Sequence, residues 1–180
     1  MLRSAIIRFI VGACIRRIQQ RKQGEREKKY SFVVHTERQK DSHAWQERVV
    51  TAIRDSLIRS ANTNANLLIR LIEDAYNDLS KSVGLLGKSV PNIGEVTNEV
   101  IQALKEDSLI IIVVNSDKEA AQLLDDKGQL KLTTPMNIFI GGQILDRGIT
   151  IENLIGFYYG RRPKKYQQDT VLQHSRMFGK

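Results

Sequence analysis

An almost unbroken run of β-branched residues, SLIIIVVNSD at 108–117, is the strongest constraint on the fold of this chain. A strand of this length and composition is typical of a parallel sheet whose two faces are both covered by helices. Three further runs, at 30–36, 136–142 and 154–160, also have the composition of short strands. Strands separated by helical segments imply an α/β fold with a parallel sheet and right-handed crossovers.

Apolar residues at helical spacing predict one helix before the strand at 30–36 and another after it. Residues 1–24 predict a leading basic amphipathic helix with a stripe wide enough to face a core. That stripe consists of Leu2, Ile6, Phe9, Ile10, Ala13 and Ile18. A second helix, capped by Asp41 or Ser42, is expected to end near Ser60. Its apolar positions are Trp45, Val49, Ala52, Ile53 and Leu57.

Two more helices make residues from about 62 to 106 a helical excursion between two strands of the sheet. The first of them places six apolar residues on one face: Leu67, Leu68, Leu71, Ile72, Ala75 and Leu79. The polar residues 118–134 carry no predicted element, and 167–180 read as a short helix. All 180 residues are expected to form a single domain.

Basic residues are concentrated at the two ends of the chain. The net charge is +8, with six Lys/Arg and no acid in residues 1–24, and seven Lys/Arg against two acids in residues 147–180. This asymmetry predicts an anionic partner such as nucleic acid, a nucleotide or a membrane surface.

The single cysteine, Cys14, excludes an internal disulfide framework and indicates a reducing compartment, so a cytoplasmic location is expected. No Cys/His spacing resembles a zinc site, and each of the three histidines is expected to be an ordinary packed or surface residue. Arg8 interrupts the apolar core that a secretory signal needs, and no run reaches the ~18 apolar residues of a membrane span. A mitochondrial presequence shares the composition of residues 1–24, but their continuous stripe favours a core helix. No membrane partner is expected.

Loops that follow the carboxyl ends of parallel strands are where such sheets bind ligands. Of the three candidates, GGQILDRGIT at 141–150 is the most unusual. Gly141 and Gly142 permit close approach of a phosphate or sugar to the main chain, and Arg147 adds a planar charged fork. A turn with a local ion pair between Asp146 and Arg147 remains the alternative interpretation.

The last residues present an amide and a guanidinium together. Gln173 and Arg176 are three residues apart, so on a helix they share a face. In nucleotide hydrolases an amide orients the attacking water and a guanidinium stabilises charge on the transferring phosphoryl group.

These two segments carry a family resemblance. GGQILDRGITIENL followed by DTVLQHSRMFG resembles motifs V and VI of superfamily 2 helicases, which lie on the second of two RecA-like domains. The chain resembles more closely the Z-one domain family of helicase-like, endonuclease-associated proteins. The matching positions are Gly141, Gly142, Leu145, Arg147, Gly148, Thr150, Ile151 and Leu154, then Asp169, Thr170, Gln173, Arg176, Phe178 and Gly179. Ser175 departs from the common helicase pattern, which has a glycine there.

The resemblance implies a RecA-like motor domain over 1–180, with its motif V and VI region at 138–180. The loop from Gly141 to Gly148 would contact the nucleic-acid backbone and couple that contact to the nucleotide. Arg176 would be the arginine finger. Implied ATP-contacting residues are Gly148, Thr150, Gln173 and Arg176. Implied nucleic-acid-contacting residues are His35, Thr36, Gly141, Gly142 and Arg147. The positive charge of Arg161 and Arg162 adds these two residues to the predicted nucleic-acid contacts, with DNA favoured over RNA as the partner.

A motor ATPase also needs a phosphate-binding loop with a lysine, and an acid that holds magnesium. GLLGKS at 84–89 is two residues short of the required spacing and follows a helix, so it is predicted to be a helix C-cap and loop. The chain is therefore predicted not to hydrolyse ATP alone. ATP and Mg²⁺ are expected only beside an N-terminal RecA-like domain that carries the phosphate loop.

A second reading from a different class is a nucleic-acid-binding or scaffolding module with basic ends and no ATP chemistry. It rests on the terminal charge blocks and on Arg161, Arg162, Lys164 and Lys165 around Pro163, which can equally be a solvated loop. A nuclease is the least favoured class, because no carboxylates cluster with a lysine.

Overall fold

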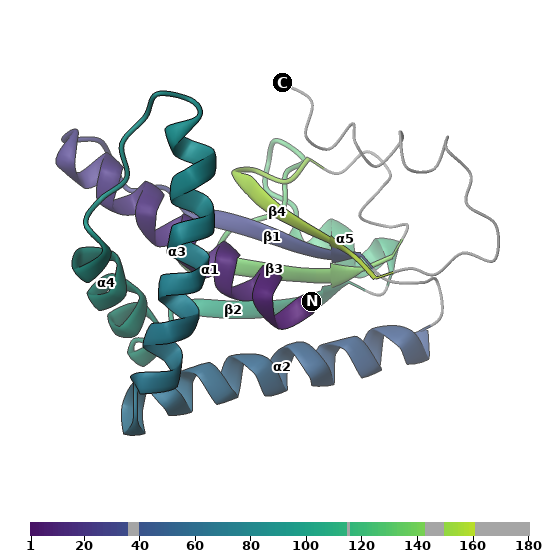
Figure 1. Cartoon of the computed structure of the whole chain (residues 1–180). Helices are drawn as coiled ribbons and strands as arrows, with labels where there is room; N and C mark the ends of the chain where they lie inside the picture. The colour runs from purple at the N-terminus through teal and green to yellow at the C-terminus, as the bar shows by residue number, and fades with distance from the viewer. Residues whose placement is uncertain (36–39, 115, 143–149, 161–180) are drawn as a thin grey trace.

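The structure of the protein, a computed structural model, describes residues 1–35, 40–114, 116–142 and 150–160 (Figure 1). The first half holds α1 (Leu2–Lys22), β1 (Tyr30–His35), α2 (Lys40–Thr63), α3 (Asn66–Gly84) and α4 (Ile93–Lys105). The second half holds β2 (Leu109–Val114), α5 (Asp117–Leu123), β3 (Met136–Gly141) and β4 (Leu154–Tyr159). The helix predicted at 167–180 lies outside the described residues.

The four strands form one sheet of order β2-β3-β1-β4, and every pair is parallel. All four predicted strands and the α/β class with helices flanking a parallel sheet are confirmed. The two central strands, β1 and β3, are buried at every position, whereas the middle of the edge strand β2 is only half-buried. The expectation that 108–117 would be covered on both faces is therefore met only in part, because β2 has a strand neighbour on one side alone.

Alternate residues of each strand face two different cores, as the pleat requires. Phe32, Val34, Ile138 and Ile140 belong to the large core, which α1, α2, α3 and α4 complete. The neighbouring positions, Val33 and Phe139 among them, face a small core closed by α5 and the segment after it. The helical layer is thus much thicker on one face of the sheet than on the other (Figure 1).

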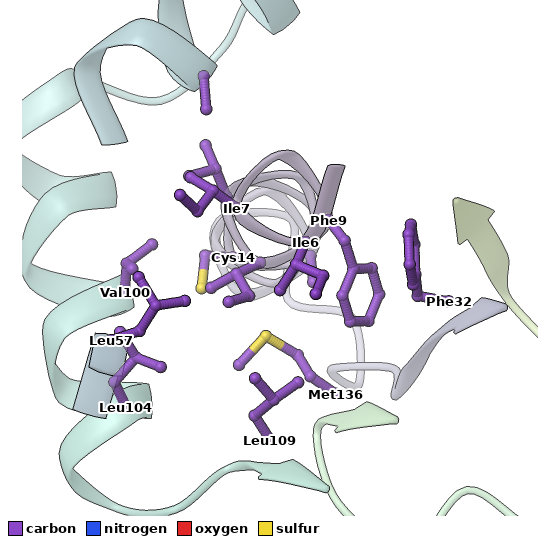
Figure 2. Close-up of a cluster of buried hydrophobic side chains, with 14 of the residues drawn as sticks. Ile6, Ile7, Phe9, Cys14, Phe32, Leu57, Val100, Leu104, Leu109 and Met136 are labelled. Carbon is purple, nitrogen blue, oxygen red and sulfur yellow. The ribbon is translucent and has the colours of Figure 1, made fainter. Parts of the chain in front are cut away.

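Helix α1 lies between the sheet and the α3–α4 pair, and it is buried on more than one side. In Figure 2 its side chains point both toward Val100 and Leu104 of α4 and toward Phe32 and Met136 of the sheet. The single amphipathic stripe predicted for residues 1–24 is too narrow. The buried residues of α1 are Ile6, Ile7, Phe9, Ile10, Val11, Ala13, Cys14, Ile15, Ile18 and Gln20.

Burial of Cys14 inside this helix gives stability a pH dependence. The thiol is 1% exposed, and burial, followed by the charge of Glu99, raises its pKa to about 12. An unfolded cysteine ionises near pH ~8.5, so the folded state loses stability as pH rises from there toward about 12. The expected loss in the free energy of unfolding is about 1.4 kcal/mol per pH unit. Urea titrations at about pH 9.5 and 10.5, above the unfolded pKa and below the folded one, would measure it, and Cys14→Ala should lack this component; an equal loss in that variant would contradict the assignment.

The helical excursion predicted at about 62–106 between two strands is confirmed, as α3 and α4. All three helices α2, α3 and α4 lie in sequence between β1 and β2, and α2 continues to Thr63. Three residues predicted to face the core do not: Trp45 is 58% and Leu67 61% exposed, and Ala52 is exposed as well. In the folded chain a neighbouring face of α2 packs against the core, and this face buries Gln46, Val50, Leu57 and Ala61.

Two loop predictions have different outcomes. Helix α3 ends at Gly84, and the following turn contains Gly87 at φ +65°, so the prediction of a helix C-cap and loop for 84–89 is confirmed. Residues 118–134, predicted to lack elements, contain α5. The Ser116 hydroxyl accepts a hydrogen bond from the Glu119 N–H at 3.2 Å, which caps this helix, and Ala120 is buried beneath it.

Candidate functional site at the carboxyl edge of the sheet

The carboxyl ends of the four strands lie level with one another. Val114 of β2 pairs with Gly141 of β3, Gly141 pairs with His35 of β1, and His35 pairs with Tyr159 of β4. We call this row of four residues the carboxyl edge. β3 and β4 lie on either side of β1; the segment that resembles motif V begins at the end of β3, and the one that resembles motif VI comes after β4 in the sequence.

His35 anchors the point at which β4 ends. Its side chain is 1% exposed and stacks on Tyr159, with ring centroids 5.2 Å apart and planes 5° from parallel. Its carbonyl oxygen accepts a hydrogen bond from the Gly160 N–H at 2.9 Å. The ring thus packs within the edge, and its contact with nucleic acid stays a prediction.

The loop predicted to touch both nucleic acid and nucleotide is fixed at its two ends. Gly141 ends β3, and both Gly141 and Gly142 are buried at the edge. On the far side of the loop, the carbonyl of the exposed Thr150 accepts a hydrogen bond from the Leu130 N–H at 3.1 Å. The structure therefore brings Gly141, Gly142 and His35 to one edge and holds Thr150 on the neighbouring segment.

Most of the residues predicted to contact ATP or nucleic acid lie outside the described part of the chain. These positions, which remain predictions, are Thr36, Arg147, Gly148, Arg161, Arg162, Gln173 and Arg176.

A further residue at this edge, Gln46 of α2, has no signal in the sequence, where it reads as an ordinary polar helix position. Its side chain is 9% exposed, and its Oε1 has no hydrogen-bond partner among the described residues. A Cβ placed on Gly160 would lie 2.7 Å from Gln46 Nε2 and 3.1 Å from the His35 carbonyl oxygen. Only glycine at position 160 allows this amide to sit beside the exit of β4.

The basic residues of α1 are largely neutralised by the chain itself. Four of the six Lys/Arg in residues 1–24 form ion pairs: Arg8 with Asp78, Arg17 with Glu27, Arg21 with Glu27 and Glu99, and Lys22 with Glu95. The hydrogen bond between Arg21 and Glu27 raises the pKa of Arg21 and lowers that of Glu27. Most of the positive charge in residues 1–24 is thus paired with carboxylates of the same fold, so less of it is available to bind phosphates.

The part of the chain that the structure describes holds neither a metal-binding cluster nor a membrane-spanning helix. No three His, Cys, Asp or Glu side chains there gather closely enough to hold a metal ion. None of the helices in those residues has the length and apolar character needed to cross a bilayer.

Comparison with known proteins gives one family and no individual relatives. Neither curated proteins nor solved structures gave a match. A family model described as the Z1 domain matches residues 1–180, and the chain therefore belongs to the Z1 domain family.

Proposed function

We propose that this chain is the second motor domain of an ATP-dependent, helicase-like protein, and that it supplies an arginine finger and part of the nucleic-acid track. One observation carries the proposal. Gly142, in the segment similar to motif V, and Gly160, which precedes the segment similar to motif VI by nine residues, lie at the same edge of a parallel sheet on the two sides of β1.

The spacing of these two points suits a shared ligand. β3, β1 and β4 are consecutive neighbours, so the chain leaves β3 and β4 at points about 10 Å apart, which is two strand spacings. Ligands of parallel sheets bind at the carboxyl edge, where loop amides and helix N-termini converge. A nucleotide held by a second domain against this edge would lie beside the points where the chain leaves β3 and β4.

The phosphate loop must come from elsewhere. The lysine-containing turn at 84–89 lies beside the last turns of α1, where the Gln19 amide donates to the Ser89 carbonyl at 2.9 Å. It follows α3 and precedes α4, and no strand of the sheet leads into it. In this position it cannot present phosphates to the carboxyl edge.

Reconstitution tests the proposal. The purified chain should show negligible ATPase with Mg²⁺, with or without single- or double-stranded DNA or RNA. Adding an N-terminal RecA-like domain that carries the phosphate loop should produce turnover that nucleic acid stimulates, and the same domain with its phosphate-loop lysine changed to alanine is the control. Turnover by the isolated chain at an ordinary enzyme rate, roughly 1–10³ s⁻¹, would refute the assignment.

The non-catalytic alternative makes a different prediction in the same experiment. DNA binding would depend steeply on salt, would fall when Arg161, Arg162, Lys164 and Lys165 are neutralised, and would not respond to ATP or to loss of Arg176.

A further inference from the structure

Two hollows lie one after the other along α1, and neither includes the carboxyl edge. The first, of about 510 Å³, is apolar and lies between α1, the end of α3 and β4; its lining includes Phe9, Gly12, Leu79, Leu86, Ile155 and Phe157. Gly12 forms part of its floor, because a Cβ there would touch the side chains of Leu79 and Ile155, 3.8 and 3.9 Å away.

The second hollow, of about 630 Å³, is polar and lies between the last turns of α1 and residues 87–91. Arg16, Gln19 and Lys88 line both hollows, so the two are continuous. We call the combined feature the α1 groove. No Asp or Glu of the described residues lines it, whereas Arg16, Lys22 and Lys88 do.

The cations where the two hollows meet differ from the other basic residues of this region. Arg8, Arg17, Arg21 and Lys22 each have a carboxylate partner within the fold. Among the described residues, Arg16 donates a side-chain hydrogen bond only to the neutral Gln19, and Lys88 forms no ion pair. An unneutralised positive charge at the centre of the groove favours an acidic occupant.

Exposed apolar side chains border the same groove. Leu86 is 74% and Ile155 40% exposed, and both line the apolar hollow, while the adjacent Leu85 is 89% exposed. These are three of the six large apolar side chains that the described residues expose. Apolar surface gathered around a hollow, rather than scattered, is typical of an interaction site.

The length of the groove indicates what kind of ligand fills it. Its lining runs from Ala5 of α1 to Gln23, the residue after this helix; these ends are eighteen residue steps apart, which is about 27 Å at 1.5 Å per residue. That span exceeds a nucleotide-sized ligand and matches about five turns of a helix laid in a groove.

We propose that the α1 groove docks an amphipathic, acidic helix of a partner protein. Apolar side chains of that helix enter between Leu86 and Ile155, and its carboxylates lie over Arg16 and Lys88. This inference does not depend on the proposed motor function, because the groove and the carboxyl edge share no lining residue.

A synthetic helical peptide of about 18 residues, with leucines on one face and glutamates beside them, is the probe, and its control replaces every glutamate by lysine. Fluorescence anisotropy with the full chain should show binding of the acidic peptide at least about 10-fold tighter than the basic one. Leu86→Ser should weaken that binding at least about 10-fold, whereas Leu67→Ser, at an exposed leucine outside the groove, should not. The double variant Arg16→Glu, Lys88→Glu should reverse the charge preference.

Three outcomes would overturn the proposal: no binding, equal binding of both peptides, or equal effects of the two leucine variants. Sedimentation of the chain without peptide identifies the remaining occupant. A dimer that Leu86→Ser dissociates would place a second copy of the chain in the groove and would also overturn it.

Discussion

Arg176→Ala is expected to lower the ATPase rate of the reconstituted two-domain protein by about 10³-fold or more, which is the effect of removing an arginine finger from a nucleotide hydrolase. The planar guanidinium stabilises charge that develops on the phosphoryl oxygens only in the transition state. The loss should therefore appear in kcat, with little change in the ATP concentration that half-saturates the enzyme.

A matched arginine separates this role from general phosphate attraction. Arg161→Ala, in the predicted nucleic-acid set, should weaken DNA binding and reduce its salt dependence, but at saturating DNA it should leave kcat close to that of the unaltered protein. The finger assignment fails if Arg176→Ala retains full turnover, or if it lowers DNA binding as much as it lowers the ATPase rate.

Much of the fold follows from local patterns. The β-branched runs place all four strands, because their length and apolar content leave few alternatives to a buried sheet. Asn92 accepts a hydrogen bond from the Gly94 N–H and marks the start of α4. The glycine turn after α3 marks the end of that helix. Local side-chain chemistry sets both boundaries. These features depend on neighbours in sequence and can be predicted from it.

The features that position the site depend on tertiary packing. No local signal places β4 beside β1, yet this pairing brings Tyr159 against His35 and sets the point at which the chain leaves β4. Helical spacing alone does not show that α3 and α4 cover the outer side of α1, which buries Ile7 as fully as Ile10. The same holds for Gln46, whose burial depends on Gly160, more than a hundred residues later.

Gly156→Val is expected to destabilise the fold by about 3 kcal/mol or more, at the upper end of overpacking in a filled core. A Cβ at this position would lie 2.4 Å from Phe32 Cδ2 and 2.8 Å from Cε2. The Phe32 ring is 2% exposed and packs on the ring of Phe9, with centroids 5.3 Å apart, so it can move only with that ring or toward the apolar hollow that both rings line. Urea denaturation of the single variant would measure the loss.

Gly84→Ala is the matched control, because a Cβ at Gly84 meets nothing within 4 Å and the backbone there is not left-handed. That variant should leave stability unchanged or raise it by up to ~1 kcal/mol, as alanine does when it replaces glycine in a helix.

The contact between Gly156 and Phe32 can be isolated by a double-mutant cycle. Phe32→Ala alone should cost about 3–5 kcal/mol, since it empties a buried ring-sized space. In the double variant, the valine at 156 can occupy part of that space, so the two losses should sum to more than the measured loss by about 1–3 kcal/mol. Additive losses would mean that the Phe32 ring does not lie over Gly156. The pairing of β4 with β1, on which the carboxyl edge depends, would then be in doubt.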